Sequence, residues 1–402
     1  MAVKPDMISY FEARDIVLKN VPLMPFEEVE LSRLGGRVLA EDLTAQVDSP
    51  SVNASLKDGY AVHSADLSGA GPDNPVSLSL IRFQGAGDPA GTELPRGAAV
   101  RLTTGAPLPP AADAVLAGEF AREEGGRILC FNDAGPGRNV LPQGIDVTKG
   151  RLMAAKGQRL NPALIGLLAA GGIDRARVYA RPKVAVIGTG DEIILPGGPL
   201  SEGRLYASNI VETAAWLTEF GLTEVLSQVV PDRIEETINE VRTLTGQVDA
   251  FITSGGAWGS ERDLMLRIMK KLGWQGLFSR VRLGPGKAIS FGLYEGRPVF
   301  ILPGGPPSHE AAFLLLALPG LLAMSGWRGP IFPRLRAKAV EKMEGRDDWT
   351  QCLHAEVFFE KEEWLVRQVK SASRLSSMAV KNSLILLPEG VSSIEKGQTV
   401  EV

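Results

Sequence analysis

Three apolar runs decide the fold: KVAVIG at 183–188, DAFITSGG at 249–256 and VFILPGG at 299–305. Each is a nearly continuous stretch of small or β-branched side chains, which is typical of parallel strands covered by helices on both faces. Segments with helical spacing separate the runs, so the pattern predicts βαβ units with right-handed crossovers. We therefore expect an α/β domain with a mostly parallel sheet from about Pro182 to Gly326.

The composition excludes some classes of protein. The chain has 402 residues, of which 44% are hydrophobic and 22% are charged. This length and apolar content predict several domains with cores of their own. The 43 basic residues against 47 acidic ones give a net charge of -4, so no surface for coating nucleic acid is expected. A bound anion must then be held by local geometry.

The cysteines and the apolar segments bear on the compartment. Cys130 and Cys352 stand far apart, without a neighbouring histidine, so we expect neither a disulfide framework nor a thiolate zinc site. Residues 1–15 lack the apolar core of a secretory signal. The run 311–324 is short and is interrupted by Pro319, so it predicts a buried helix and not a membrane span. We expect a soluble cytoplasmic protein.

Changes in the pattern of apolar and polar residues along the chain predict four domains. Residues 7–45 and 141–180 show helical spacing, which predicts two helices or a helical arm in the first segment, whereas 47–130 and the part after Pro330 consist of short alternating runs with polar turns. The expected division is listed here: a discontinuous helical or mixed domain at 1–46 and 141–180, a small β-rich domain at 47–140, the α/β domain at 181–329, and a C-terminal β domain at 330–402.

Glycine-rich loops follow the strands of the α/β domain. Parallel strands end at one edge of a sheet, so the loops after Ile187, Thr253 and Leu302 should lie together. A fourth loop, GPGK at 284–287, adds a lysine. Each loop alone could simply turn the chain, but several at one edge indicate a site for an anion such as phosphate. None matches a Walker loop or a dinucleotide fingerprint.

Carboxylates accompany these loops. Asp191 and Glu192 lie in the first loop, and Asp263 follows the second. Carboxylates that face a phosphate repel it unless a divalent cation lies between them, so their presence indicates magnesium. Asp263 could equally cap a helix, and the two roles are compatible. Glu192 could instead be a solvated loop residue.

Seven motifs, in this order, resemble the MoeA family of molybdopterin molybdotransferases, which is similar to the C-terminal domain of gephyrin. They are SLKDGYA at 55–61, TGAPLPPAADAV at 104–115, GID at 144–146, TGDEI at 189–193, SGGAWGSERD at 254–263, GPGKAISFG at 284–292 and LPGGPPS at 302–308. The segment SRLSSMAVKNSLILLPEG at 373–390 resembles the final domain of the family. Together the motifs extend over essentially the whole chain.

The resemblance implies a fold and an activity. The fold is a multidomain α/β protein: a central MogA-like three-layer domain, a helical or mixed arm, a small β domain and a C-terminal β-barrel-like domain. The implied reaction inserts molybdate, or tungstate, into adenylylated molybdopterin and releases AMP in the presence of Mg²⁺. It also implies a homodimer, a ligand site completed by the partner's β domain, and contacts with a MogA-type adenylyltransferase and with molybdoenzyme apoproteins. No nucleic acid or membrane partner is implied.

The motifs also assign residues to roles. The implied catalytic residues are Asp58, Thr104, Asp146, Glu192 and Asp263, of which Asp58, Glu192 and Asp263 would hold the metal. The implied ligand-binding residues are Gly188, Thr189, Gly190, Asp191, Ser254, Gly255, Gly256, Pro285, Gly286, Lys287, Pro303, Gly304, Gly305, Pro306 and Ser308.

The chain departs from the family pattern at several anion-binding positions. Gly284 replaces the first lysine of the K-P-G-K loop, Gly305 replaces the asparagine of P-G-N-P, and LPQ at 141–143 replaces arginines. Trp258 replaces a serine, and the glycine that follows is displaced to Gly259. Each lost charged contact is worth roughly 1.5–3 kcal/mol when buried. A non-catalytic protein that binds a pterin, the molybdenum cofactor or a nucleotide is therefore the alternative, and a peptide-binding scaffold is a weaker one.

Overall fold

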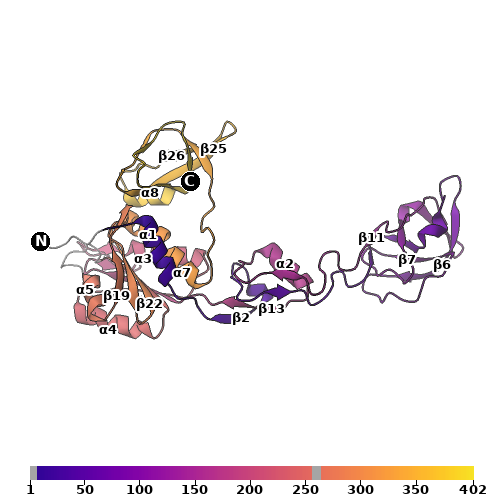
Figure 1. Cartoon of the computed structure of the whole chain (residues 1–402), viewed down its shortest axis with the longest axis horizontal. Coiled ribbons are helices and arrows are strands. Elements are labelled where there is room, and N and C mark those ends of the chain that lie inside the picture. Colours follow the sequence, from indigo (N-terminus) through magenta and orange to yellow (C-terminus); the bar gives the residue numbers. More distant parts are fainter. Residues whose placement is uncertain (1–6, 256–263) are drawn as a thin grey trace. The chain divides into compact units, whose positions relative to one another are not determined.

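The chain forms two compact units. The computed structural model describes residues 7–255 and 264–402. Unit 1 contains Met1–Glu27 and Tyr179–Val402, and unit 2 contains Glu28–Val178. Figure 1 shows that the chain begins in unit 1, leaves it to build unit 2, and returns to finish unit 1.

A six-stranded sheet forms the centre of unit 1. Its strands, in spatial order, are β17 (Val225–Val230), β14 (Val184–Thr189), β18 (Ala250–Ser254), β22 (Arg297–Leu302), β21 (Ser290–Tyr294) and β19 (Gln275–Ser279). The first four run parallel, β21 is antiparallel to β22, and β19 is antiparallel to β21. The expected α/β domain with a mostly parallel sheet is thereby confirmed.

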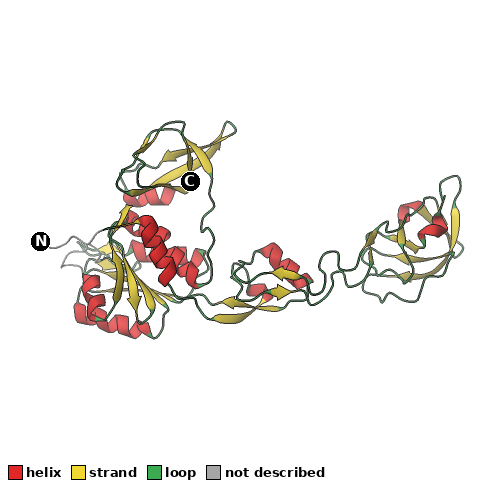
Figure 2. Ribbon diagram, in the orientation of Figure 1, coloured by secondary structure: helices red, strands yellow, loops and turns green. Residues whose placement is uncertain are grey.

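Helices cover both faces of this sheet, as Figure 2 shows. Side chains alternate along β14, so Val184 and Val186 point into one core, and Ala185 and Ile187 point into the other. The elements on the first face are α1 (Tyr10–Asn20), α3 (Ser208–Glu219), α6 (Pro306–Ala312), the π-helical turn η4 (Phe313–Ala317) and α7 (Leu318–Met324). The second face is covered by α4 (Ile234–Thr245) and α5 (Leu264–Lys271).

The helical stretch Pro306–Met324 is a core element. By length and composition it is apolar enough to cross a membrane, but 78% of it is buried inside unit 1. The expected buried helix is therefore confirmed, and it is longer than the sequence indicated. Pro319 lies within this continuous stretch, just after the π-helical turn Phe313–Ala317, and it has no N–H to donate to that preceding turn.

A second sheet in unit 1 carries the C-terminal strands. Its path is β1 (Ile8–Ser9), β20 (Val281–Gly284), β25 (Thr350–Glu360), β26 (Glu363–Gln368), β23 (Arg336–Ala339) and β29 (Thr399–Glu401), with β27 (Ser383–Leu387) on β25. Two short strand pairs and one helix complete unit 1: β15 (Ile193–Ile194) with β16 (Leu205–Tyr206), β24 (Met343–Glu344) with β28 (Ser393–Ile394), and α8 (Arg374–Val380). Because β20 belongs to this sheet, the C-terminal strands are joined directly to the GPGK loop.

Unit 2 contains the small β domain. Its six-stranded sheet has the order β8 (Ala114–Ala117), β5 (Gly59–Val62), β7 (Ala98–Leu102), β6 (Val76–Gln84), β10 (Arg127–Cys130) and β9 (Ala121–Glu124). The other elements are listed here: β2 (Phe26–Glu30), β3 (Leu43–Thr44), β4 (Ala54–Ser55), β11 (Val140–Leu141), β12 (Leu152–Ala154), β13 (Arg175–Tyr179), α2 (Pro162–Ala170), and the 3-10 turns at 31–33, 64–67 and 118–120.

The first 45 residues differ from the expected pair of helices. Among residues 7–45, α1 is the one α-helix, beside the 3-10 turn at 31–33; its buried Ala13 and Val17 pack in the core of unit 1. Pro22 and Pro25 prevent the helix from continuing, and Phe26–Glu30 then forms strand β2. The structure thus places α1 with the α/β domain and not with the arm.

Candidate functional site

Three glycine-rich loops converge at the carboxyl ends of β14, β18 and β22. A Cβ atom on Gly255 would lie 2.9 Å from the carbonyl oxygen of Thr189 and 3.0 Å from its hydroxyl. A Cβ on Gly304 would lie 3.5 Å from the Cα of Gly255. Gly255 also has φ +100°, which side chains rarely adopt. Only glycine at this point lets the loops approach so closely.

Asn209, near the start of α3, ties two of these loops together. Its buried side-chain amide donates to the Ser254 hydroxyl at 2.9 Å and to the Gly304 carbonyl at 2.9 Å. The Oδ1 atom of Asn209 is buried and has no hydrogen-bond partner among the described residues. Sequence reasoning missed Asn209, because a single polar residue at the start of a helix is usually only a local cap.

His309 fixes the third loop from α6. Its Nδ1 lies 3.2 Å from the Pro303 carbonyl, and its Nε2 lies 2.8 Å from the Thr213 hydroxyl on α3. Burial lowers the pKa of His309 to about 4, so the ring is neutral at physiological pH. A neutral ring with its proton on Nδ1 satisfies both contacts, since it donates to Pro303 and accepts from Thr213. The sequence contained no pattern that marked this residue.

The remaining predicted residues of these loops have defined places. A Cβ on Gly188 would meet Ile210 Cδ1 at 2.4 Å, and one on Gly190 would meet the Glu192 carboxylate at 2.5 Å. Gly305 is the N-cap residue of α6 but provides no side chain to cap it. Pro306 and Ser308 follow in the first turn of that helix.

Three carboxylates gather at the end of β14 and β17. Asp191 and Glu192 are exposed, and the backbone N–H of Asp232 donates to Asp191 Oδ1 at 3.2 Å. Burial raises the pKa of Asp232, and the negative charges of Asp191 and Glu192 raise it further. Asp232 was not among the predicted site residues. Its position just after a strand of the same edge was the available signal.

No group of three acidic, histidine or cysteine side chains is arranged to hold a metal ion within residues 7–255 and 264–402. The predicted metal ligand Asp263 and the predicted ligand-binding Gly256 lie outside the described residues, as do Trp258 and Gly259. Asp58, the third predicted metal ligand with Glu192 and Asp263, belongs to unit 2.

Lys287 is an exposed cation on the fourth loop. Its Nζ lies 5.3 Å from the centroid of the Trp349 ring, and no carboxylate in the described chain forms an ion pair with it. Gly286 packs against the helices, because a Cβ there would lie 3.6 Å from the backbone nitrogen of Ala312. At Gly284, next to Pro285, a Cβ would lie 3.2 Å from the side-chain amide of Gln351. The lysine of the family pattern is thus absent from a position that faces an amide.

In unit 2 the structure brings Asp58 and Thr104 together. The backbone N–H and the hydroxyl of Thr104 donate to Asp58 Oδ1 at 2.6 Å and 2.9 Å. These two bonds, the backbone one first, lower the pKa of Asp58. The exposed Asp58 carboxylate is therefore ionised at neutral pH, and the other carboxylate oxygen stays available.

Asp146 lies in a different turn of unit 2. Its backbone N–H donates to the Ser49 carbonyl at 3.0 Å, and its side chain is exposed. No hydrogen bond joins its carboxylate to Asp58 or Thr104 in the described chain. The turn is nevertheless anchored beside the Asp58 segment, because the N–H of Gln143 donates to Asn53 Oδ1 at 2.9 Å.

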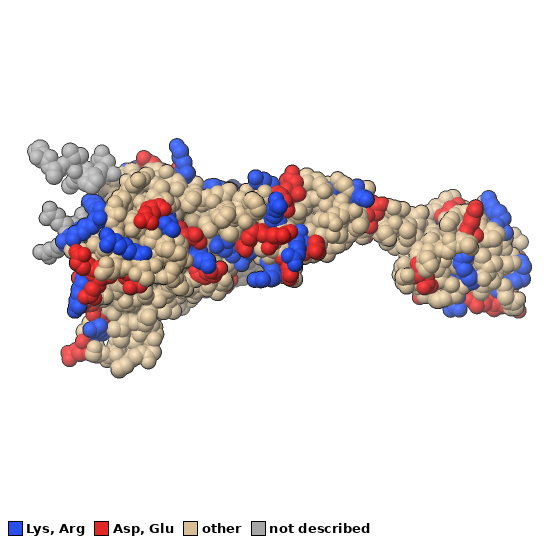
Figure 3. All heavy atoms as spheres, turned by 90° about the horizontal axis from the view of Figure 1, so that it is seen from below, with Lys and Arg blue, Asp and Glu red and all other residues tan. Residues whose placement is uncertain are grey.

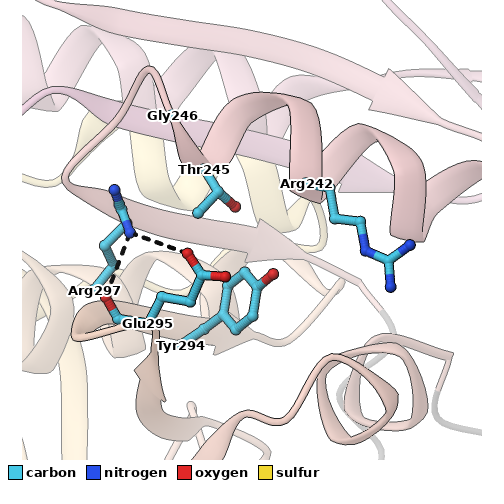
Figure 4. Close-up of a pocket in the computed structure, with 6 residues that line it drawn as sticks. All are labelled: Arg242, Thr245, Gly246, Tyr294, Glu295 and Arg297. Carbon is cyan, nitrogen blue, oxygen red and sulfur yellow. Dashed lines mark hydrogen bonds and ion pairs between the residues drawn. The ribbon is translucent and has the colours of Figure 1, made fainter.

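One cavity of about 370 Å³ lies away from the loops (Figure 4). Thr245 and Gly246 at the end of α4, and Arg297 at the amino end of β22, line it, so it opens at the opposite edge of the sheet. Arg297 already pairs with Glu295 at 3.5 Å. The cavity is therefore distinct from the loop cluster. On the face that Figure 3 displays, basic and acidic side chains are interspersed, which agrees with a site built from local geometry.

The chain is similar in sequence and structure to known proteins. Residues 8–172 match the model of the MoeA N-terminal region (domain I and II), and residues 185–323 match that of a probable molybdopterin binding domain. The molybdopterin molybdenumtransferase of Haemophilus influenzae is 31% identical over 404 residues and is covered to 98%, as is this chain. The chain belongs to the MoeA family. Membership places it among the transferases of molybdenum cofactor biosynthesis.

Other relatives of this MoeA-family chain agree. The molybdopterin molybdenumtransferase of Bacillus subtilis is 31% identical over 372 residues, which span 91% of this chain and 86% of that protein. A solved structure of the molybdopterin biosynthesis MoeA protein from Pyrococcus horikoshii has a TM-score of 0.82 and 32% identity, and the similarity covers 99% of this chain and 98% of that one. The multidomain α/β fold is thus shared over the full length.

Proposed function

We propose that this chain inserts molybdate, or tungstate, into adenylylated molybdopterin and releases AMP in a magnesium-dependent reaction. The observation that supports this most is the convergence of the loops at Thr189, Gly255 and Gly304, with Lys287 exposed on a fourth loop. The glycines allow backbone N–H groups to approach phosphate oxygens, and the lysine supplies positive charge. Such groups stabilise the charge that develops when a pyrophosphate link breaks.

The acidic residues fit magnesium by their chemistry. Asp191 and Glu192 offer hard oxygen ligands, and their negative charge adds to burial in raising the pKa of the nearby Asp232. Mg²⁺ is commonly held by one or two carboxylates together with the phosphates of a substrate, so a closed cage of three is not required. We propose that Glu192 is the central ligand, assisted by Asp191; the resemblance implies Asp263 and, from the partner's β domain, Asp58 as the further ligands. When bound, the ion would neutralise the pyrophosphate oxygens.

Asp58 and Thr104 have a separate task in this proposal. Because Thr104 lowers the pKa of Asp58, the carboxylate acts as an anion that accepts a proton or a cation, and not as an acid. Thr104 also fixes its orientation through two bonds to one oxygen. Asp146 on the adjacent turn is the third residue of unit 2 that we assign to the reaction.

The test is a direct assay of AMP release. The purified protein is incubated with adenylylated molybdopterin, Mg²⁺ and molybdate, and AMP is quantified by chromatography. We expect release that depends on both Mg²⁺ and molybdate. Release no greater than that of the double variant Asp58→Asn with Glu192→Gln would refute the proposal.

Gly284 and Gly305 favour the alternative, a protein that binds a pterin or a nucleotide without turnover. Both positions lack the polar side chain of the family pattern, and nothing lies within 4 Å of a Cβ on Gly305. Gly305→Asn should therefore fit without strain, and Gly284→Lys requires only a shift of the Gln351 side chain. If these two substitutions together raise AMP release from the background to a clear rate, the native chain is a binder. If they change it little, the native loops suffice for catalysis.

The assembly and location are also part of the proposal. The family resemblance supports a homodimer, contacts with a MogA-type adenylyltransferase and with molybdoenzyme apoproteins, and a cytoplasmic location. Two buried free cysteines agree with a reducing compartment. Sedimentation velocity tests the dimer, and a monomer at micromolar concentration would contradict it.

A further inference from the structure

The C-terminal sheet supports the GPGK loop directly. Strand β20 leads into this loop and pairs with β25, where Gly284 faces Gln351. On its other edge β25 pairs with β27, where Gln351 faces Leu387. Trp349, just before β25, is 9% exposed, and its ring centroid lies 5.3 Å from Lys287 Nζ. The C-terminal strands are therefore in contact with the lysine of the proposed anion site.

A bidentate ion pair fixes β20 just before the loop. Arg282 on β20 donates from Nε and Nη2 to the two carboxylate oxygens of Glu389, at 3.1 Å each. Its Nη1 also donates to the Met7 carbonyl. The Arg282 and Glu389 side chains are 34% and 31% exposed, so the pair is mostly shielded from water. A planar contact with two parallel bonds fixes orientation as well as distance, so Glu389 holds the strand that carries the GPGK loop.

A second ion pair fixes the helix that follows the LPGG loop. Lys381, between α8 and β27, donates from Nζ to Oε1 of Glu310 on α6 and to the Met378 carbonyl at 2.9 Å. The Lys381 and Glu310 side chains are only 9% and 2% exposed. Glu310 Oε2 makes no hydrogen bond among the described residues, although His354 Nε2 lies 3.2 Å away. Because an unpaired charge at this depth is strongly unfavourable, the pair holds α6 to the C-terminal sheet.

Both ion pairs come from one short segment of the chain. Lys381 and Glu389 lie on either side of β27, and each residue of β27 is paired in register with β25. The separation of the two ion pairs is thus fixed by the sheet. Their targets also meet, because a Cβ on Gly286 would lie 3.6 Å from the backbone nitrogen of Ala312 on α6. The segment belongs to the motif at 373–390, whose residues have no role in the reaction proposed above.

We propose that residues 381–389 form a clamp that sets the spacing between the GPGK loop and the LPGG loop, and that Lys381 and Glu389 are positioning residues for the anion. Glu389 acts on the strand that carries the loop of Lys287, and Lys381 acts on the helix that follows the LPGG loop. An anion that bridges the two loops needs them at one separation, so loss of either ion pair weakens binding even where the fold is intact. The inference rests on the proposed function for the identity of the anion.

Calorimetry with inorganic pyrophosphate tests the clamp in two variants. One is Glu389→Gln, and the other is the double variant Glu310→Met with Lys381→Met, which replaces both buried charges by apolar groups of similar length. Such a replacement often leaves stability unchanged or raises it, so urea unfolding of the double variant should not fall below that of the native protein. The matched control is Glu401→Gln, because Glu401 also pairs with an arginine, Arg334 at 3.0 Å, but lies on β29, which β25, β26 and β23 separate from β20 along the sheet.

We expect the Kd for pyrophosphate to rise severalfold in both clamp variants and to stay at the native value in the control. Native affinity in both clamp variants would overturn the proposal. If the double variant does not fold, Glu389→Gln decides alone, since its ion pair is about one-third exposed and its loss is tolerated more easily. The reversed pair, Arg282→Glu with Glu389→Arg, should recover much of the affinity that Glu389→Gln loses.

A double-mutant cycle with Lys287→Ala separates positioning from general loosening. Lys287→Ala should weaken pyrophosphate binding strongly in the native background and much less in Glu389→Gln, because there the lysine is already displaced. Equal losses in the two backgrounds would refute the positioning role.

Hydrogen exchange without ligand separates this inference from the proposed function. We expect faster exchange of 281–289 in Glu389→Gln and of 303–312 in the double variant, with exchange of β14, in the other sheet, unchanged in both. If pyrophosphate does not bind the native protein, the proposed function fails and exchange alone decides on the clamp. Native exchange rates in both segments would then refute it.

Discussion

Gly255→Ala tests the convergence of the loops most directly. An alanine at φ +100° costs about 1–3 kcal/mol of backbone strain. Its Cβ would lie 2.9 Å from the Thr189 carbonyl oxygen, which is backbone and cannot turn away, so overpacking adds about 1–3 kcal/mol. We expect a loss of roughly 2–6 kcal/mol in the free energy of unfolding of unit 1. Pyrophosphate affinity should fall with it, because the loop after β18 must move.

Urea unfolding followed by tryptophan fluorescence is the assay. All six tryptophans lie in unit 1, so the signal reports on that unit; they are Trp216, Trp258, Trp274, Trp327, Trp349 and Trp364. Gly246→Ala is the matched control, since Gly246 has φ -77° and nothing lies within 4 Å of its Cβ. The control should change stability by less than about 0.5 kcal/mol. If Gly255→Ala unfolds at the same urea concentration as the control, the loops do not converge as described.

Three further predictions concern individual groups. Thr104→Val should raise the pKa of Asp58, measured by NMR of the labelled carboxyl carbon, while Thr104→Ser should preserve it; an unchanged value in Thr104→Val would show that the hydroxyl bond is absent. Burial lowers the pKa of folded His309 from its ordinary 6.5 to about 4. The stability that the neutral ring contributes is therefore lost as pH falls from 6.5 through 4, and the loss in the free energy of unfolding approaches about 3 kcal/mol. Urea unfolding of His309→Gln should lack that part of the acid dependence. Burial raises the pKa of Cys130 to about 11 and of Cys352 to about 12, so neither thiol should react with an aromatic disulfide reagent at pH 8 until urea unfolds the chain; rapid labelling of the native protein would contradict their burial.

The sequence predicted the parts of the fold that depend on local patterns. The apolar runs that became β14, β18 and β22 have the length and composition of buried parallel strands, and their order along the chain predicted the edge at which the loops meet. The partner of α1 could not be predicted in this way. Ala13 and Val17 mark an apolar face of α1, but the sequence does not specify which distant core this face enters. Its packing against η4 and α7 is seen only in the structure.

The loop residues of the candidate site could be predicted from the sequence, but the buried residues that hold the loops together could not. Glycine loops and carboxylates have recognisable types and positions, so Thr189, Ser254 and Lys287 could be singled out. Asn209 and His309 were missed because the contacts that join α3 to the Gly304 loop and to His309 link residues 95 and 96 positions apart, and such pairs leave no periodic pattern in the sequence.

The excursion of the chain into unit 2 has a consequence for biosynthesis. Helix α1 leaves the ribosome before unit 2 is made, but the segments that bury it, η4 and α7, follow only after residue 312. Residues 28–178 can fold completely during that interval, since all their internal contacts are already synthesised. The nascent chain must therefore keep an amphipathic helix exposed while an entire unit matures behind it. A messenger truncated between residues 179 and 312 would yield a folded unit 2 tethered to an unfinished unit 1, which is a natural substrate for chaperones and proteases.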